Sequence, residues 1–163
     1  MKREELSVIR QAILMEVEGY EFYKIASNQF EDKKVKEVFL NLMEEEKGHV
    51  EWLKEAFEKF KNHDDDEFTL AFLENPPSPN LFDWSKLMTK TASIPLTVFG
   101  IALEMEKSSV NFYKNAKDNT ENEKLKKLFW ILETWEKGHY EQFDKTYANL
   151  KEDWWSDQGY APF

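Results

Sequence analysis

The chain has 163 residues, a net charge of −10, no cysteine and an aromatic content of 15%. That length suffices for one domain with a packed core, so we expect residues 1–163 to form a single domain. Without cysteine the chain can form no disulfide, thiolate-ligated zinc site, iron–sulfur cluster or rubredoxin-type iron centre. The negative charge argues against nucleic acid as a partner.

The N-terminal stretch MKREELSVIR is charged and leads into no apolar segment, so the sequence shows no signal peptide. No apolar run approaches the length of about 20 residues that a membrane span needs. Together with the missing cysteines, these features predict a cytoplasmic protein without a membrane partner.

Four segments with helical periodicity follow in chain order. Residues 3–62 hold the first two, in which inward positions alternate in steps of three and four, the pattern of a helix that packs in a bundle. Residues 63–92 follow as a long crossover that contains the helix-breaking run NPPSPN. Residues 93–150 hold the second pair, and Thr120 with Glu123 forms a predicted capping box for its second helix.

The connections favour two antiparallel hairpins, because the link within each pair is short and the link between the pairs is long. We therefore predict an all-α, ferritin-like four-helix bundle made of two repeated antiparallel helix hairpins joined by a long crossover. The C-terminal tail, residues 151–163, is rich in aromatic side chains (KEDWWSDQGYAPF). We expect this tail to pack on the bundle or on a neighbouring subunit.

The two halves of the chain repeat each other when the sequence is shifted by 90 residues. The alignment needs no gaps, and it brings the stretch EKGHVE of the first half over EKGHYE of the second. Unrelated segments share roughly one residue in fifteen by chance. A helix hairpin that is used twice predicts a bundle with pseudo-twofold symmetry.

Six polar residues occupy predicted core positions near the middle of this bundle. They are two single glutamates and two Glu-x-x-His pairs: Glu16, Glu106, Glu46 with His49, and Glu136 with His139. Residues three apart lie on the same helix face, so each paired glutamate points the same way as its histidine. Four buried carboxylates without a cation would repel one another and lose hydration, at a cost on the order of several kcal/mol per ion.

Two divalent metal ions would balance this charge. Oxygen-rich ligands with one imidazole per metal suit iron or manganese, with zinc as a common substitute. The alternative is a core of protonated, hydrogen-bonded glutamates or trapped water, and four symmetric carboxylates make it the weaker interpretation.

The arrangement resembles the ferritin-like di-iron carboxylate proteins, and its compact two-repeat form is most similar to rubrerythrins. The resemblance covers residues 3–150 and rests on the two single glutamates and the two Glu-x-x-His pairs. It implies two bound iron ions, with manganese or zinc as alternatives. It further implies that Glu46 and Glu136 bridge the ions and that Glu16 and Glu106 are terminal ligands.

Three further positions bear on the resemblance to rubrerythrins: two tyrosines and one serine. Tyr23 and Tyr113 each lie seven residues after the single glutamate of their helix, and the resemblance implies that they donate hydrogen bonds to ligand carboxylates. Ordinary core packing is the alternative for both. Ser109 stands where rubrerythrins carry an additional glutamate ligand, one turn after Glu106, so the symmetric set is closer to bacterioferritin sites.

The resemblance implies a redox enzyme that reduces hydrogen peroxide or dioxygen, with peroxide as the leading substrate. Because the chain has no rubredoxin centre of its own, the electrons must come from an external donor such as a rubredoxin. The alternatives are a ferroxidase or other iron-handling role, a plain metal-binding protein, and a manganese catalase-like activity. We expect a homodimer or a larger homo-oligomer.

Overall fold

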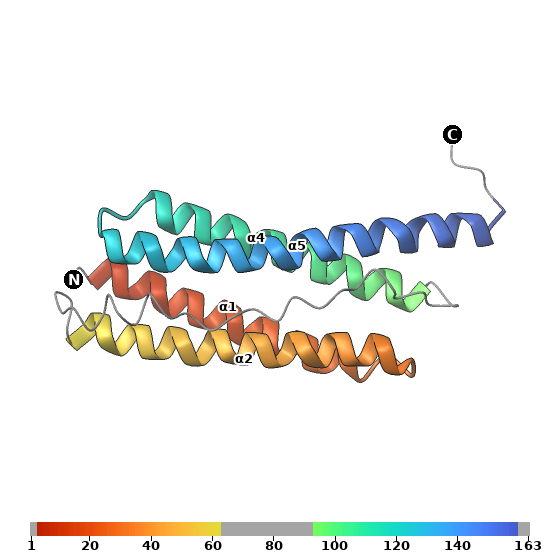
Figure 1. The fold of residues 1–163 in the computed structure, drawn as a ribbon, viewed down its shortest axis with the longest axis horizontal. Coiled ribbons are helices and arrows are strands. Elements are labelled where there is room, and N and C mark those ends of the chain that lie inside the picture. Colours follow the sequence, from red (N-terminus) through yellow and green to blue (C-terminus); the bar gives the residue numbers. More distant parts are fainter. Residues whose placement is uncertain (1–2, 63–92, 160–163) are drawn as a thin grey trace.

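The computed structural model describes residues 3–62 and 93–159, which form four helices. These are α1 (Arg3–Ser27), α2 (Lys33–Asn62), α4 (Ser93–Asp118) and α5 (Glu123–Asp157). Helix α1 pairs with α2 and α4 pairs with α5, and the two hairpins lie side by side in one bundle (Figure 1). The predicted ferritin-like bundle of two helix hairpins is confirmed. The predicted crossover, residues 63–92, lies outside the described residues, and the single domain over residues 1–163 stays a prediction.

Side-chain caps begin the second helix of each hairpin. Asp32 Oδ1 accepts hydrogen bonds from the backbone N–H groups two and three residues later, at 2.8 and 3.2 Å. Asn122 Oδ1 does the same for the start of α5, at 3.0 and 3.3 Å. Each cap satisfies backbone donors that have no partner within the helix. The two caps are 90 residues apart, so the repeat extends to the helix starts.

The capping box predicted for Thr120 and Glu123 is wrong. The cap of α5 is Asn122, and Glu123 is already the first residue of the helix. Thr120 Oγ1 instead accepts the backbone N–H of Asn122, at 3.2 Å. The spacing suggested a box, but an asparagine directly before the helix competes for the same backbone donors.

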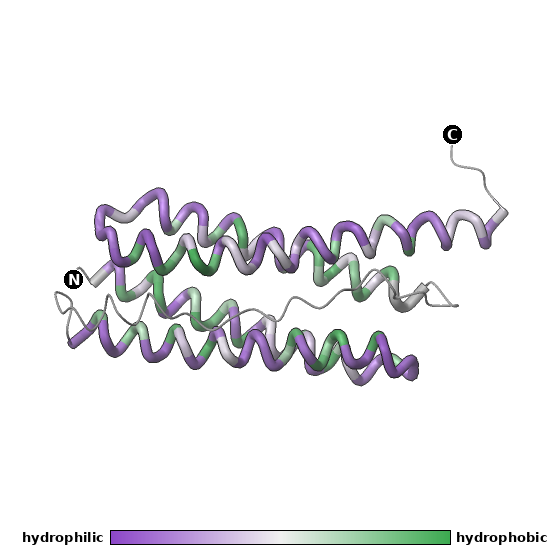
Figure 2. Tube along the Cα trace, in the orientation of Figure 1, coloured by the Kyte–Doolittle hydropathy of each residue, from purple (hydrophilic) through white to green (hydrophobic). Residues whose placement is uncertain are grey.

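Two clusters of buried apolar side chains fill the bundle. One includes Ile9 and Ala12 of α1, and the other includes Tyr23 and Ala26 of the same helix. Glu16 lies between these residues along α1, so the polar residues predicted from the repeat form a layer between two apolar layers. Figure 2 shows hydrophobic residues interspersed with hydrophilic ones along the helices, as expected for helices that bury one face.

Helix α5 continues beyond its predicted end at residue 150 and reaches Asp157. Residues 151–158 contain no glycine or proline, and Gly159, which has a φ of 70°, lies just after the helix C-cap. The ring centroids of Trp154 and Trp155 are 4.9 Å apart, and Trp155 is 43% exposed. Residues 151–159 do not pack on the bundle, since all except the half-buried Trp154 are exposed. Packing of the tail on a neighbouring subunit stays a prediction, and residues 160–163 lie outside the described residues.

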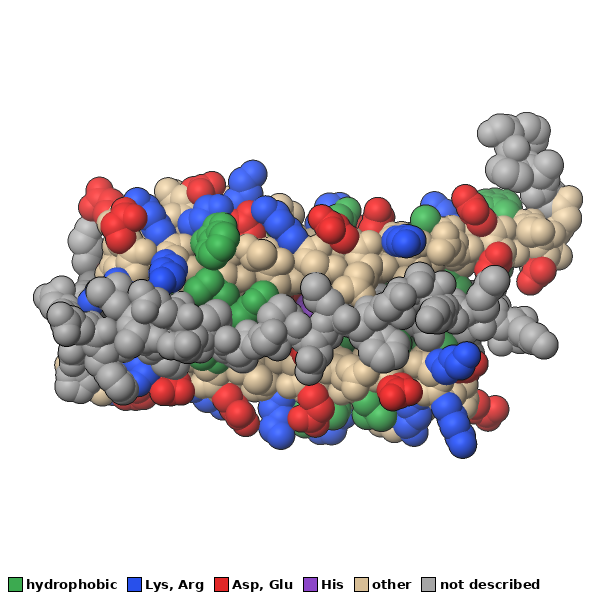
Figure 3. Space-filling model, viewed as in Figure 1, with side chains coloured by type: hydrophobic (Ala, Val, Ile, Leu, Met, Phe, Trp, Pro, Cys, Tyr) green, Lys and Arg blue, Asp and Glu red, His purple; other side chains and the backbone are tan. Residues whose placement is uncertain are grey.

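Charged side chains cover the outer helix faces. Figure 3 shows acidic and basic side chains interspersed over the described helices on one face of the molecule. Several form ion pairs one turn apart on the same helix, such as Lys126 with Glu123 at 2.6 Å. Such pairs stabilise a helix by a few tenths of a kcal/mol each, roughly. None of the four described helices contains an apolar stretch of the length that a membrane span requires.

Candidate metal centre

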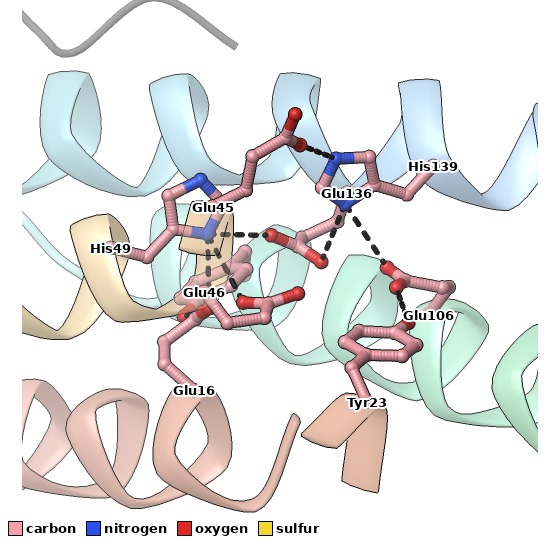
Figure 4. A network of polar contacts seen from close by, with 9 residues as sticks. Glu16, Tyr23, Glu45, Glu46, His49, Glu106, Glu136 and His139 are labelled. Carbon is pink, nitrogen blue, oxygen red and sulfur yellow. Dashed lines mark hydrogen bonds and ion pairs between the residues drawn. The ribbon is translucent and has the colours of Figure 1, made fainter. Parts of the chain in front are cut away.

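All six predicted site residues meet in the middle of the bundle. Helices α1 and α4 contribute one glutamate each, and α2 and α5 contribute one Glu-x-x-His pair each (Figure 4). None of the six is more than 4% exposed. Helical spacing explains this convergence, since residues three apart share a face and the inward face of each helix is set by its apolar neighbours.

On one side of the site, Nδ1 of His49 lies among carboxylate oxygens from three helices. It is 3.1 Å from Oε2 of Glu16, 3.2 Å from Oε2 of Glu46 and 3.6 Å from Oε1 of Glu136. Four potential ligand atoms are thus brought together without any intervening apolar side chain.

On the other side, Nδ1 of His139 is 3.7 Å from Oε2 of Glu106 and 4.0 Å from Oε2 of Glu136. Within the described part of the chain, three buried atoms of the whole site have no hydrogen-bond partner: Nδ1 of His139, Oε2 of Glu106 and, on the His49 side, Oε1 of Glu136. An unsatisfied buried polar group costs about 1–3 kcal/mol. All three are atoms that ligate divalent metals, so the residues present fit a metal centre.

The potential ligand atoms form two overlapping sets. Glu16, Glu46, His49 and Glu136 make one set, and Glu46, Glu106, Glu136 and His139 make the other. Within each set the ligand atoms lie within 4.8 Å of one another. Because the two paired glutamates belong to both sets, they lie where carboxylates that bridge two ions would have to lie.

Both predicted tyrosines contact the site. The Tyr23 hydroxyl of α1 donates a hydrogen bond to Oε1 of Glu106 on α4, and the Tyr113 hydroxyl of α4 donates one to Oε1 of Glu16 on α1. Each tyrosine therefore reaches the glutamate of the other repeat. The two hydrogen bonds tie the hairpins together and leave the second oxygen of each carboxylate facing the site.

The carboxylates divide into two kinds by pKa. Burial alone would raise the pKa of Glu16, but hydrogen bonds with Glu46, His49 and Tyr113 lower it to about 2. Burial and the negative charge of Glu16 raise the pKa of Glu46 well above its usual value. Burial and the charges of neighbouring glutamates do the same for Glu136. Protons on the paired glutamates thus replace the positive charge that a metal would bring.

The negative charges around His139 favour its protonated form. Burial disfavours its charged form, but the neighbouring Glu106 carboxylate, the hydrogen bond to Glu45 and the Glu46 charge raise its pKa to about 10. Burial would raise the pKa of Glu106, yet the contacts with His139 lower it. The pKa values of Glu16 and Glu106 are therefore both lowered, and each of these carboxylates lies beside an imidazole nitrogen.

Residues 7–147 match the family model described as Rubrerythrin. The chain belongs to the rubrerythrin family. The match spans all six predicted site residues and both tyrosines. Neither a curated protein nor a solved structure matches the chain. Because rubrerythrins are ferritin-like proteins with a di-iron site, the buried carboxylate–histidine cluster is compatible with such a site.

Two small residues, Gly19 and Ser109, occupy equivalent positions of the repeat. Ser109 is half-buried and lines a groove of about 760 Å³ between α1 and α4. Its counterpart in the first repeat is Gly19, where an added Cβ would lie only 3.4 Å from Cδ of Glu46. Gly19 therefore allows the backbone of α1 to lie close to the Glu46 carboxylate.

Glu45 is the site residue that sequence reasoning missed. Its Oε2 lies 2.8 Å from Nε2 of His139, on the side of the ring that faces away from the cluster. It directly precedes Glu46, so it lies about 100° further round the helix and off the inward stripe. The only signal in the sequence is the acidic run EEE, which is also typical of a solvated helix face.

Proposed function

We propose that this rubrerythrin is a di-iron peroxidase, which reduces hydrogen peroxide to water with electrons from an external donor. The observation that carries the proposal is the pair of overlapping ligand sets, in which three buried atoms have no hydrogen-bond partner among the described residues. The proposed ligands of one ion are Glu16 and His49, those of the other are Glu106 and His139, and the bridging ligands are Glu46 and Glu136.

When bound, two ferrous ions supply one electron each, and with two protons these convert one hydrogen peroxide to two waters. The chain supplies the environment for this chemistry. Burial of the six residues excludes bulk water, which strengthens electrostatic interactions inside the site. The shared position of Glu46 and Glu136 allows them to adjust as the charge of the site changes.

The tyrosines act as fixed donors in this proposal. Burial and the charge of Glu106 raise the pKa of Tyr23 well above its usual value, and burial with Glu16 does the same for Tyr113. Both phenols therefore stay protonated at neutral pH. Each holds the carboxylate that it contacts in one orientation and leaves the other oxygen free to ligate.

The groove between α1 and α4 is the proposed path for a small oxidant. Met15 and Met105, which line it, directly precede the two terminal glutamates in the chain. Ser109 is a small residue in the same wall. The electrons need a separate carrier, because the chain has no cysteine with which to hold a rubredoxin-type centre. We propose a rubredoxin-like donor protein.

Stopped-flow mixing of the anaerobic ferrous protein with hydrogen peroxide or with dioxygen tests the proposal. We expect peroxide to oxidise the protein faster, and turnover to require an added donor. The Glu46→Ala variant should bind no iron pair and should react with neither oxidant beyond the rate of free iron. Faster oxidation by dioxygen would contradict the peroxidase assignment.

A ferroxidase with iron storage is the second candidate. The symmetric set of four glutamates and two histidines, with Ser109 in place of a further carboxylate, favours it. Storage needs a large cage, so sizing of the native protein in solution separates the two functions. Uptake of many irons per chain by a large oligomer would move the assignment to storage. Metal analysis of the purified protein would reveal a manganese catalase-like enzyme.

A further inference from the structure

The two site histidines differ in their partners outside the carboxylate cluster. Nε2 of His139 is 2.8 Å from Oε2 of Glu45. The ring of His49 instead stacks on the indole of Trp135, with centroids 4.7 Å apart and planes inclined by 12°. Among residues 3–62 and 93–159, no carboxylate contacts Nε2 of His49, whose polar contacts all involve Nδ1.

This difference breaks the repeat at one position. Trp135 follows Glu45 by 90 residues, so the two are counterparts in the two hairpins. Both contacts cross between α2 and α5: Glu45 lies at Nε2 of His139, whereas Trp135 lies over the ring face of His49. The repeat therefore supplies an internal comparison, in which one histidine has an acidic partner and its counterpart has an aromatic one.

A carboxylate and an indole act differently on a metal-binding imidazole. A carboxylate that accepts the Nε2 proton fixes the tautomer, so the lone pair of Nδ1 points at the site, and it makes that nitrogen a stronger ligand. The side chain of Glu45 is only 13% exposed and that of His139 only 2%, so water screens this contact little. A stacked indole holds the plane of His49 but accepts no proton from its nitrogen.

We infer that Glu45 makes the two metal positions unequal, so that the His139-side position fills first and the His49-side position fills second. The inference rests on the proposed two-metal site and makes Glu45 a positioning residue, which acts on the ion through His139. Loss of such an outer partner typically lowers metal affinity about 10–100-fold. We expect the two positions to differ by a comparable factor.

Zinc titration of the full-length apo protein, followed by nuclear magnetic resonance with ¹⁵N-labelled histidine, tests the order directly. The chain has only three histidines, so the ring signals of His49 and His139 are readily resolved. Zinc is redox-inert and diamagnetic, so it reports binding without turnover. The first equivalent should shift the His139 signals, and the second should shift the His49 signals.

The Glu45→Leu variant should weaken the His139-side step about 10–100-fold and leave the His49-side step unchanged. Glu45→Gln retains an acceptor oxygen, so the His139-side position should still fill first. Its loss of zinc affinity should be smaller than that of Glu45→Leu. Glu44→Leu is the matched control, because it removes the same charge one residue away, where Glu44 pairs with Lys47 on the surface at 3.6 Å. The control should leave both steps unchanged.

Three results would overturn the inference. Simultaneous shifts of both histidines at every zinc ratio would show equal positions. If Glu45→Leu and Glu44→Leu weakened zinc binding equally, the effect would come from the loss of one negative charge and not from the contact with His139. Prior filling of the His49-side position would reverse the order. Each leaves the two-metal site intact, whereas an apo protein that binds no zinc at all would contradict the proposed function as well.

Discussion

Tyr23 and Tyr113 are the clearest single-residue contributors to the site. Each is at most 1% exposed and donates to a terminal glutamate on the opposite hairpin. A buried carboxylate oxygen that loses its tyrosine donor has no water nearby to replace the hydrogen bond. Loss of the hydroxyl alone should therefore destabilise the protein, even when the aromatic ring is kept. The effect should be equal in the two repeats, because the two contacts are symmetric.

Replacement of either tyrosine by phenylalanine should lower the free energy of unfolding of the metal-free protein by about 1–3 kcal/mol. Urea unfolding in the presence of a chelator measures the loss. Tyr20→Phe is the control on the same helix, since Tyr20 is only half-buried and its ring lies against Lys24 rather than at the site. A loss in this control as large as in Tyr23→Phe would contradict the role given to the site hydroxyls.

The paired glutamates should make the stability of the metal-free protein depend on pH. The pKa of Glu46 is raised well above 4.5 in the folded state, so above pH 4.5 the folded state holds a proton that the unfolded state has lost. The free energy of unfolding therefore falls as pH rises above that value. Glutamine at this position keeps a hydrogen-bond donor and cannot ionise.

We expect the stability advantage of Glu46→Gln over the unsubstituted chain to grow between pH 5 and pH 8, at roughly these values, in the presence of a chelator. Thermal unfolding at each pH measures it. Glu44→Gln, at an exposed position, should show no such growth. A difference between Glu46→Gln and the parent that stays constant with pH would show that Glu46 ionises normally.

At the scale of single helices, the start of α5 depends on Asn122, whose side chain accepts two backbone N–H groups. Removal of such a cap typically costs about 1 kcal/mol, with a range of roughly 0.5–2. Asp32 makes the same contacts at the start of α2, so it offers a matched position in the other repeat.

We expect Asn122→Ala and Asp32→Ala to destabilise the protein by about 1 kcal/mol each. Thr120→Ala should cost less, because Thr120 accepts from one backbone group outside the helix. Chemical denaturation of the three variants under identical conditions compares them. If Thr120→Ala proved the most damaging, the cap of α5 would have to be reassigned.

For the whole molecule, the polar layer between two apolar clusters is the dominant feature. Metal that binds the folded state alone stabilises it by about 2.7 kcal/mol per site when its free concentration is 100 times the dissociation constant. In the unfolded chain the proposed metal-binding residues are far apart, so it cannot bind two ions with the affinity of the folded protein. Stability should therefore follow metal concentration.

Iron(II), manganese(II) or zinc(II) should raise the melting temperature of the apo protein. Glu46→Leu should abolish this rise, and its own melting temperature without metal should equal or exceed that of the parent, because a buried ionisable group is gone. Calorimetry with and without each metal measures both effects. An apo protein whose melting temperature ignores all three metals would contradict the metal centre.

The sequence alone was sufficient for the helices, for the repeat and for the six residues that face the site. All three depend on local periodicity, since three or four residues make one turn and the apolar positions show which face turns inward. Glu16 and Glu46 could be placed in the core in this way without knowledge of any contact. The same reasoning failed for the end of α5, because an aromatic composition does not stop a helix and Gly159 does.

Only the tertiary structure decided which residues meet across helices. The contact of Glu45 with His139 depends on how far one hairpin is shifted and rotated against the other, and so does the stacking of Trp135 on His49. Helical periodicity predicts which way a side chain points. It does not predict which residue of a neighbouring helix lies at the same level along the bundle axis. The symmetry of the inward-facing glutamates and histidines could therefore be predicted, whereas the different partners of His49 and His139 required the packed bundle.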